Sequence, residues 1–228
     1  GKSSLVKAGI VPKLFVPRRI PGVAFLRRVV LRPSDAQEGE DLFDALARRL
    51  TMQVSADEGL SELIGPGQSV AGLAAHLRNA TAEPAYPIAT VLGQLAVAAR
   101  QDGRMLEHET ARLVLVLDQL EELFTNELLT PLERQRFIAL IAGLVRSGRV
   151  WVIATMRKDF WHQADDTPEL VHMAESHGRL ELLPPTQTQL SQMIRRPAAA
   201  AGVGFEHHPT TDVPLNEIIA EEVAHEAG

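Results

Sequence analysis

The sequence predicts an α/β fold in which a parallel β-sheet is flanked by helices, and three observations support this prediction. Residues 113–117 are a continuous apolar run, as strands buried on both faces usually are, and residues 150–155 are expected to form a second buried strand. Amphipathic stretches with helical spacing lie between and around these runs. The alternation of strands and helices indicates a parallel sheet, because parallel strands are joined by crossover helices.

In the first half of the chain, proline and glycine residues separate the periodic segments. Pro12 should interrupt a helix that begins at Ser3, because proline lacks the backbone N–H that a helix interior needs. The segment that begins at Asp41 places leucine and phenylalanine at helical spacing. We therefore expect a helix over 3–11, a strand over 24–31, a helix over 41–50, a short helical piece over 70–77 and a helix over 88–100.

In the second half, the boundaries of the elements are marked in the same way. Pro131 suits the first turn of a helix, and Pro184 follows a short apolar run. The helices after about residue 185 differ in character from the preceding core, so we expect a core over 1–185 and a lid or second domain over 186–228. The expected elements are a strand over 113–117, a helix over 131–146, a strand over 150–155, a short strand over 179–183 and helices over 186–201 and 215–227.

Composition excludes several classes of protein. The 228 residues are 45% hydrophobic and 23% charged, which is ordinary for a globular domain that can bury a sizeable core. No apolar run reaches the roughly 18 residues of a membrane span, so we expect no membrane insertion. The chain has no cysteine, which excludes disulfides and fits a cytoplasmic protein. The eight histidines form no H-E-x-x-H pattern, so no zinc site is predicted.

The net charge of −6 is distributed unevenly along the chain. Residues 1–34 carry eight lysines and arginines and no acidic residue, whereas the remainder has a net charge of −14. A local excess of positive charge suits a polyphosphate or a nucleic acid. The acidic remainder argues against a general nucleic-acid-binding surface, so no nucleic-acid partner is expected.

The chain begins with a short motif that points to phosphate binding. Gly1, Lys2, Ser3 and Ser4 match the second half of the pattern G-x-x-x-x-G-K-[ST], a loop whose backbone N–H groups cradle phosphates. In a complete loop the lysine reaches the β- and γ-phosphates and the hydroxyl holds Mg²⁺ at a helix N-terminus. The alternative is a frayed polar terminus in which a serine caps the helix.

A second group of residues follows the apolar run at 113–117. Asp118 stands at the carboxyl end of this predicted strand, where open α/β sheets place their ligands, and its carboxylate could hold Mg²⁺. Glu121 and Glu122 come directly after it, and either could polarise an attacking water. The alternative is that Asp118 caps the next helix and that both glutamates are exposed.

Arg157 follows the second buried run and is the third candidate. If both strands end at the same edge of the sheet, its guanidinium could reach a γ-phosphate and stabilise the charge there. Thr155 is a neutral alternative for the same role. The competing interpretation is a salt bridge from Arg157 to Asp159 or to Asp118.

Taken together, three segments resemble the STAND class of P-loop NTPases, and above all the bacterial novel STAND NTPase domain. The segments are GKSSLVKAGIVP, LVLVLDQLEELFT and IATMRKDF. A later segment at 194–206 resembles the beginning of that family's helical lid. The resemblance covers nearly the whole chain, and the block that begins at Asp118 is its most specific part. Leu120 stands where the family often has phenylalanine.

The resemblance implies an ATP- or GTP-driven, Mg²⁺-dependent switch in signal transduction. Lys2 and Ser3 would match the Walker A motif, Asp118 the Walker B motif and Arg157 the sensor position, while one of the two glutamates would be the catalytic acid. Proteins of this class are large and multidomain. The resemblance therefore also implies covalently linked effector and sensor domains, and homo-oligomers that form on activation.

The chain departs from this family pattern at both ends. The first sheet strand and the opening half of the phosphate-binding loop do not precede Lys2, and the tail stops inside the expected lid. We therefore expect a fragment that begins inside the motif and binds nucleotide poorly. A nanomolar affinity for ATP would contradict this expectation.

Two other functions fit the same residues. A constitutive motor ATPase would show fast basal turnover that needs no further ligand. A degenerate P-loop scaffold would only mediate protein–protein contacts, and the substitutions Lys2→Ala and Asp118→Ala would then change neither nucleotide binding nor signalling.

Overall fold

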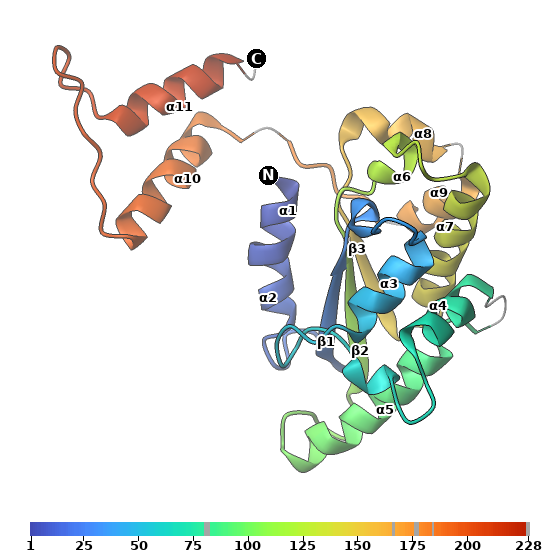
Figure 1. Cartoon of the computed structure of the whole chain (residues 1–228). Helices are drawn as coiled ribbons and strands as arrows, with labels where there is room; N and C mark the ends of the chain where they lie inside the picture. The colour runs from blue at the N-terminus through green and yellow to red at the C-terminus, as the bar shows by residue number, and fades with distance from the viewer. Residues whose placement is uncertain (80–82, 166, 176–177, 184, 227–228) are drawn as a thin grey trace. The chain divides into compact units, whose positions relative to one another are not determined.

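The computed structural model describes residues 1–79, 83–165, 167–175, 178–183 and 185–226. The chain divides into two compact units, Gly1–Arg179 and Leu180–Gly228. The first unit contains a β-sheet with helices on both faces, and the second contains two helices (Figure 1).

The sheet of the first unit has three parallel strands in the order β1-β2-β3. The strands are β1 (Val23–Leu31), β2 (Thr110–Leu117) and β3 (Val150–Ala154). They confirm the predicted α/β fold and its parallel sheet. The register between β1 and β2 shifts by one residue after Phe25, where β1 contains an irregularity.

Helices cover the two faces of this sheet unequally (Figure 1). Alternate residues of β2 point to opposite faces, as the two-residue period of a strand requires. Leu113, Leu115 and Leu117 therefore join the large core, whereas Val114 and Val116 join a small one. The large core packs against α3 (Leu42–Thr51), α4 (Val70–Asn79), α5 (Tyr86–Gln101) and α7 (Pro131–Arg146); the small core packs against the N-terminal helical run.

The N-terminal run continues through Pro12, and the prediction that this proline interrupts the helix is wrong. It comprises α1 (Lys2–Ser4), a π-helical segment (Leu5–Ile10) and α2 (Val11–Leu14). Pro12 lies in the first turn of α2, where a missing N–H costs little. The wider π-helical turn precedes it, and the N–H of Val11 donates to the carbonyl of Val6 across that turn.

Short elements connect the main ones. Most helix boundaries agree with the sequence prediction to within two or three residues. The short elements are the 3₁₀ turns Pro33–Asp35, Ser61–Leu63 and Lys158–Phe160, and the helices α6 (Glu122–Thr125), α8 (Trp161–Asp165) and α9 (Pro168–Ala174).

The predicted strand over 179–183 is absent, and this prediction is wrong. The backbone of these residues has no regular structure, and the side chains of Leu180 and Leu183 are largely exposed. A strand forms only where a neighbour accepts its hydrogen bonds, and among the described residues no strand pairs with this segment.

The second unit is a pair of packed helices, α10 (Gln187–Ala200) and α11 (Leu215–Glu226). The side chain of Thr186 caps α10 by accepting from the backbone N–H of Gln189. The side-chain oxygen of Gln189 in turn accepts from the backbone N–H of Thr186. Arg195 of α10 forms a 2.6 Å ion pair with Glu217 of α11. Ala227, the end of the last predicted helix, lies outside the described residues.

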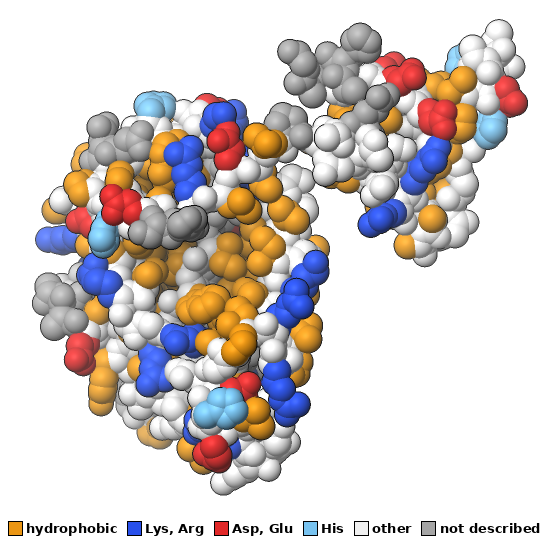
Figure 2. All heavy atoms as spheres, turned by 180° about the vertical axis from the view of Figure 1, so that it is seen from behind, with side chains coloured by type: hydrophobic (Ala, Val, Ile, Leu, Met, Phe, Trp, Pro, Cys, Tyr) orange, Lys and Arg blue, Asp and Glu red, His pale blue; other side chains and the backbone are white. Residues whose placement is uncertain are grey.

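Hydrophobic side chains also gather on the surface of the first unit. Figure 2 shows them from behind, with lysine and arginine side chains along their border. Trp151 of β3 is partly exposed, and its ring meets that of Phe25 edge-on at 5.0 Å. Within the described ranges, no helix has the length and hydropathy that crossing a bilayer requires.

Candidate functional site

The carboxyl ends of the three strands are tied together by backbone hydrogen bonds that continue beyond the sheet. The N–H of Asp118 donates to the carbonyl of Leu31 at 2.9 Å, and the N–H of Thr155 donates to that of Leu117 at 2.9 Å. The N–H of Leu120 then donates to the carbonyl of Thr155 at 2.8 Å. Asp118 and Thr155 therefore stand side by side at one edge of the sheet, where parallel α/β folds bind their ligands.

The carboxylate of Asp118 is buried and has partners on both oxygens. Its residue is only 2% exposed. The hydroxyl of Thr155 donates to Oδ1 at 2.7 Å, and the ammonium of Lys7 lies 2.6 Å from Oδ2. Burial raises the pKa of Asp118, but hydrogen bonds from Lys7, Ser3 and Thr155 outweigh it and lower the pKa to about 2. The carboxylate is thus charged at any physiological pH.

This pKa predicts an acid-dependent loss of stability. Because the folded-state pKa lies below the ordinary value of 3.8, Asp118 stabilises the fold above pH 4, and this contribution is lost as the pH falls towards 2. The contribution at neutral pH is about 2 kcal/mol. Urea unfolding between pH 5 and pH 2.5 should therefore show a shallower loss of stability in Asp118→Asn than in the wild type. An equal loss of stability with falling pH in both proteins would contradict the lowered pKa of Asp118.

A left-handed residue turns the chain immediately after Asp118. Gln119 has φ = 58°, a backbone conformation that residues other than glycine rarely adopt. Its backbone N–H donates to the hydroxyl of Thr155 at 2.9 Å, and its side-chain oxygen accepts from Arg32. These two bonds hold the strained turn, which directs the following glutamates.

The structure separates the two glutamates that the sequence left equivalent. Glu122 forms a 2.8 Å ion pair with Arg32 and accepts from the backbone N–H of Ser34 at 2.9 Å. It therefore fastens α6 to the segment that follows β1. A side chain with two fixed partners has little freedom to orient a water molecule.

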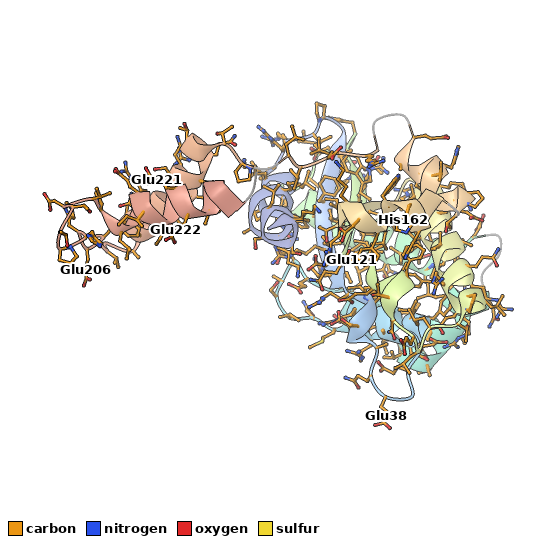
Figure 3. The ribbon with its side chains drawn as sticks, turned by 90° about the horizontal axis from the view of Figure 1, so that it is seen from above. Glu38, Glu121, His162, Glu206, Glu221 and Glu222 are labelled. Carbon is orange, nitrogen blue, oxygen red and sulfur yellow. The ribbon has the colours of Figure 1, made fainter. Side chains whose placement is uncertain are left out.

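Glu121 has a different environment. It is 9% exposed, and its carboxylate accepts from the backbone N–H of Arg157 at 3.3 Å. After the hydrogen bond with Asp159, the negative charge of Glu121 is also among the causes that raise the pKa of Arg157. Figure 3 shows Glu121 inside the first unit near the ends of the strands, whereas Glu38 projects from the rim. Glu121 is therefore a buried carboxylate close to Asp118 with free hydrogen-bonding capacity.

The guanidinium of Arg157 pairs with Asp159, one of the two partners that the competing interpretation named. It forms a 2.6 Å ion pair with Asp159 and lies over the ring of Phe160 at 5.6 Å. The hydrogen bond from Arg157 lowers the pKa of Asp159, and the positive charge of Lys2 contributes to the same effect. Lys2 and Arg157 thus lie near one acidic group at the edge of the site. The sensor role of Arg157 stays a prediction.

The structure also contains a residue that sequence reasoning missed. Ser3 and Asp118 were both predicted as metal ligands, and Ser3 contributes to the lowered pKa of that carboxylate. Their role as ligands stays a prediction. Lys7 was not singled out. Its position four residues after Ser3 was the available signal, because residues at this spacing share one face of a helix. Gly1 accepts from the N–H of Leu5 at 3.1 Å, and Ser4 is exposed.

The donor set at Asp118 suits a magnesium ion that is shared with a phosphate. The described residues contain no cluster of three or more histidine, cysteine, aspartate or glutamate side chains. Mg²⁺ does not require one, since it commonly takes one or two carboxylates and completes its shell with phosphate oxygens and water. The buried carboxylate of Asp118 and the adjacent hydroxyl of Ser3 are ligands of this type.

A cavity of about 720 Å³ lies elsewhere, beside the connection between α4 and α5 and along α7. Leu77, Pro84 and Leu140 contribute to its lining, together with Arg136 and Arg146. None of the predicted site residues lines it. The case for the candidate site therefore rests on the geometry of the strand ends and not on the size of a cavity.

The parallel sheet, the helix that begins at Lys2 and the carboxylate at the end of β2 define an NTPase domain of the P-loop type. A family model described as Novel STAND NTPase 1 matches residues 1–228. The chain therefore belongs to this family, which confirms the resemblance found in the sequence. No curated protein and no solved structure matches the chain.

Proposed function

We propose that this chain is the nucleotide-binding and nucleotide-hydrolysing switch domain of a signal-transduction protein, with ATP or GTP as substrate and Mg²⁺ as cofactor. The observation that carries the proposal is the buried carboxylate of Asp118 at the carboxyl edge of the sheet, which is held by Thr155 and by Lys7 of the N-terminal run. A serine after Lys2 and a buried strand-end carboxylate are what an Mg²⁺–nucleotide site requires.

Each side chain has a separate role in this proposal. Lys2 binds the β- and γ-phosphates, and Ser3 and Asp118 hold Mg²⁺, which neutralises charge on the transferring phosphoryl group. Thr155 keeps the carboxylate of Asp118 in a fixed orientation through its 2.7 Å hydrogen bond. We assign Glu121, and not Glu122, as the base that orients the attacking water, because Glu122 is engaged by Arg32 and Ser34.

The experiment that tests the proposal is nucleotide binding by the variant Lys2→Ala. In the full-length protein, isothermal titration with ATP and GTP should show a loss of affinity of at least about tenfold, since one charge-assisted phosphate contact contributes roughly 1.4 kcal/mol or more. Lys13→Ala is the matched control, because Lys13 is an exposed lysine of the same helical run. Unchanged affinity in Lys2→Ala, or an equal loss in Lys13→Ala, would contradict the proposed role.

The remaining parts of the proposal rest on family membership. They are a cytoplasmic location, covalently linked effector and sensor domains, and homo-oligomers that form on activation. The proposed partial lid over 186–228 belongs with them, and the two-helix second unit is compatible with that role. Nucleotide-dependent self-association, followed by light scattering with ATP, GTP and no nucleotide, tests the oligomer directly.

A further inference from the structure

We infer that Lys7 is an internal substitute for the divalent cation at Asp118, and that the metal must displace its ammonium to bind. This inference rests on the proposed function and identifies a residue that sets the metal affinity of the site. It starts from the 2.6 Å contact between the ammonium of Lys7 and Oδ2 of Asp118.

The two oxygens of Asp118 are divided between two kinds of partner. Oδ1 accepts from the neutral hydroxyl of Thr155, which fixes the orientation of the carboxylate. Oδ2 faces the cation and is the oxygen at which a metal would compete with Lys7. Since a divalent ion and an ammonium repel each other, they cannot share this oxygen at low cost.

The side chains of Asp118 and Lys7 differ in burial, and this difference allows a metal ion to replace the ammonium of Lys7. The side chain of Asp118 is 3% exposed, whereas that of Lys7 is 42% exposed. Removing the cation from a buried ion pair strongly destabilises a fold, because it leaves an uncompensated buried charge. Lys7 can return to solvent without such a cost, because its ammonium sits on a flexible four-carbon stem.

The position of Lys7 on the N-terminal run brings it next to the proposed metal ligands. Ser3 and Lys7 are one helical turn apart, so their side chains reach the same carboxylate from one helix. In the described residues, Asp118 is the sole ion-pair partner of Lys7. The ammonium therefore has no competing acid to hold it once a metal takes Oδ2.

The inference is tested by measuring Mn²⁺ binding to the full-length protein without nucleotide, from the electron paramagnetic resonance signal of free Mn²⁺. Lys7→Met should bind Mn²⁺ at least about tenfold more tightly than the wild type, because the competing charge is gone. Lys7→Arg keeps the charge and should bind like the wild type. Lys13→Met is the control for a general change in surface charge and should also bind like the wild type.

A second readout follows thermal unfolding with and without Mn²⁺. Without metal, Lys7→Met should melt at a lower temperature than the wild type, and Mn²⁺ should restore more of its stability than it adds to the wild type. If Lys7→Met does not fold, Lys7→Gln replaces it, because the amide can still donate to Asp118 without carrying charge.

The outcomes separate this inference from the proposed function. Equal Mn²⁺ affinity in the wild type and the neutral Lys7 variants overturns the inference, and so does an equal gain in Lys13→Met. If Asp118→Asn abolishes Mg²⁺-dependent nucleotide binding while the neutral variants bind Mn²⁺ like the wild type, the inference about Lys7 alone fails. If Asp118→Asn leaves that binding unchanged, the proposed function fails as well.

Discussion

Replacing Glu121 with glutamine should reduce nucleotide hydrolysis by about 10²- to 10⁴-fold, the usual contribution of a general base. Glutamine keeps the size of the side chain and can still accept from the N–H of Arg157, but it cannot take a proton from water. Nucleotide affinity should change little, since Glu121 is not proposed to hold phosphate or metal. Single-turnover phosphate release, measured beside equilibrium binding in the full-length protein, distinguishes the two effects.

The matched control for this substitution is its neighbour. Glu122→Gln breaks the ion pair with Arg32 and should lower thermal stability, but its hydrolysis rate should stay much closer to the wild type. The opposite result, slow hydrolysis in Glu122→Gln and normal hydrolysis in Glu121→Gln, would reverse the assignment. Equal and small effects in both variants would contradict the assignment of either glutamate as the base, whereas a wild type that shows no hydrolysis would favour the scaffold.

The largest expected effect on stability belongs to Phe137 of α7. Its side chain is 0% exposed, and its ring meets that of Phe43 edge-on at 5.9 Å, where α7 packs on α3. Phe137→Ala should lower the free energy of unfolding by about 3–5 kcal/mol, because it removes buried apolar surface and leaves a cavity between the two helices. Calorimetry should show a fall in the melting temperature on the order of 10 °C.

Leu132→Ala is the control within the same helix. Leu132 is 56% exposed, so its truncation should change the free energy of unfolding by less than about 0.5 kcal/mol. A loss in Phe137→Ala no greater than that in Leu132→Ala would show that α7 does not pack on the sheet as described.

The parts of the fold that depend on local sequence were predictable. The apolar run that became β2 is buried on both faces, and such strands have a distinctive composition. β3 also forms, but the prediction that it is a buried strand is wrong: only Val150 is buried, because β3 lies at an edge of the described sheet. The helix α7 begins at Pro131 and ends before Gly148, which has φ = 64° and continues no helix. The position of Asp118 at the carboxyl end of β2 was predictable because it directly follows the apolar run.

The parts that depend on distant contacts were not predictable. Our proposal of Glu121 rather than Glu122 rests on the ion pair of Glu122 with Arg32, which lies 90 residues from it in the sequence. Lys7 reaches Asp118 only because the N-terminal run packs beside the end of β2. The segment over 179–183 has the composition of a strand, but composition does not supply the neighbour with which a strand must pair.

The central claim is that Asp118 and Ser3 hold Mg²⁺ against the phosphates of a bound nucleotide. The most direct measurement is the affinity for ATP and for GTP with and without Mg²⁺, in the full-length wild type and in Asp118→Asn. We predict that Mg²⁺ strengthens binding of one or both nucleotides to the wild type and that Asp118→Asn removes this dependence. A dependence on Mg²⁺ that is unchanged in Asp118→Asn would contradict the claim.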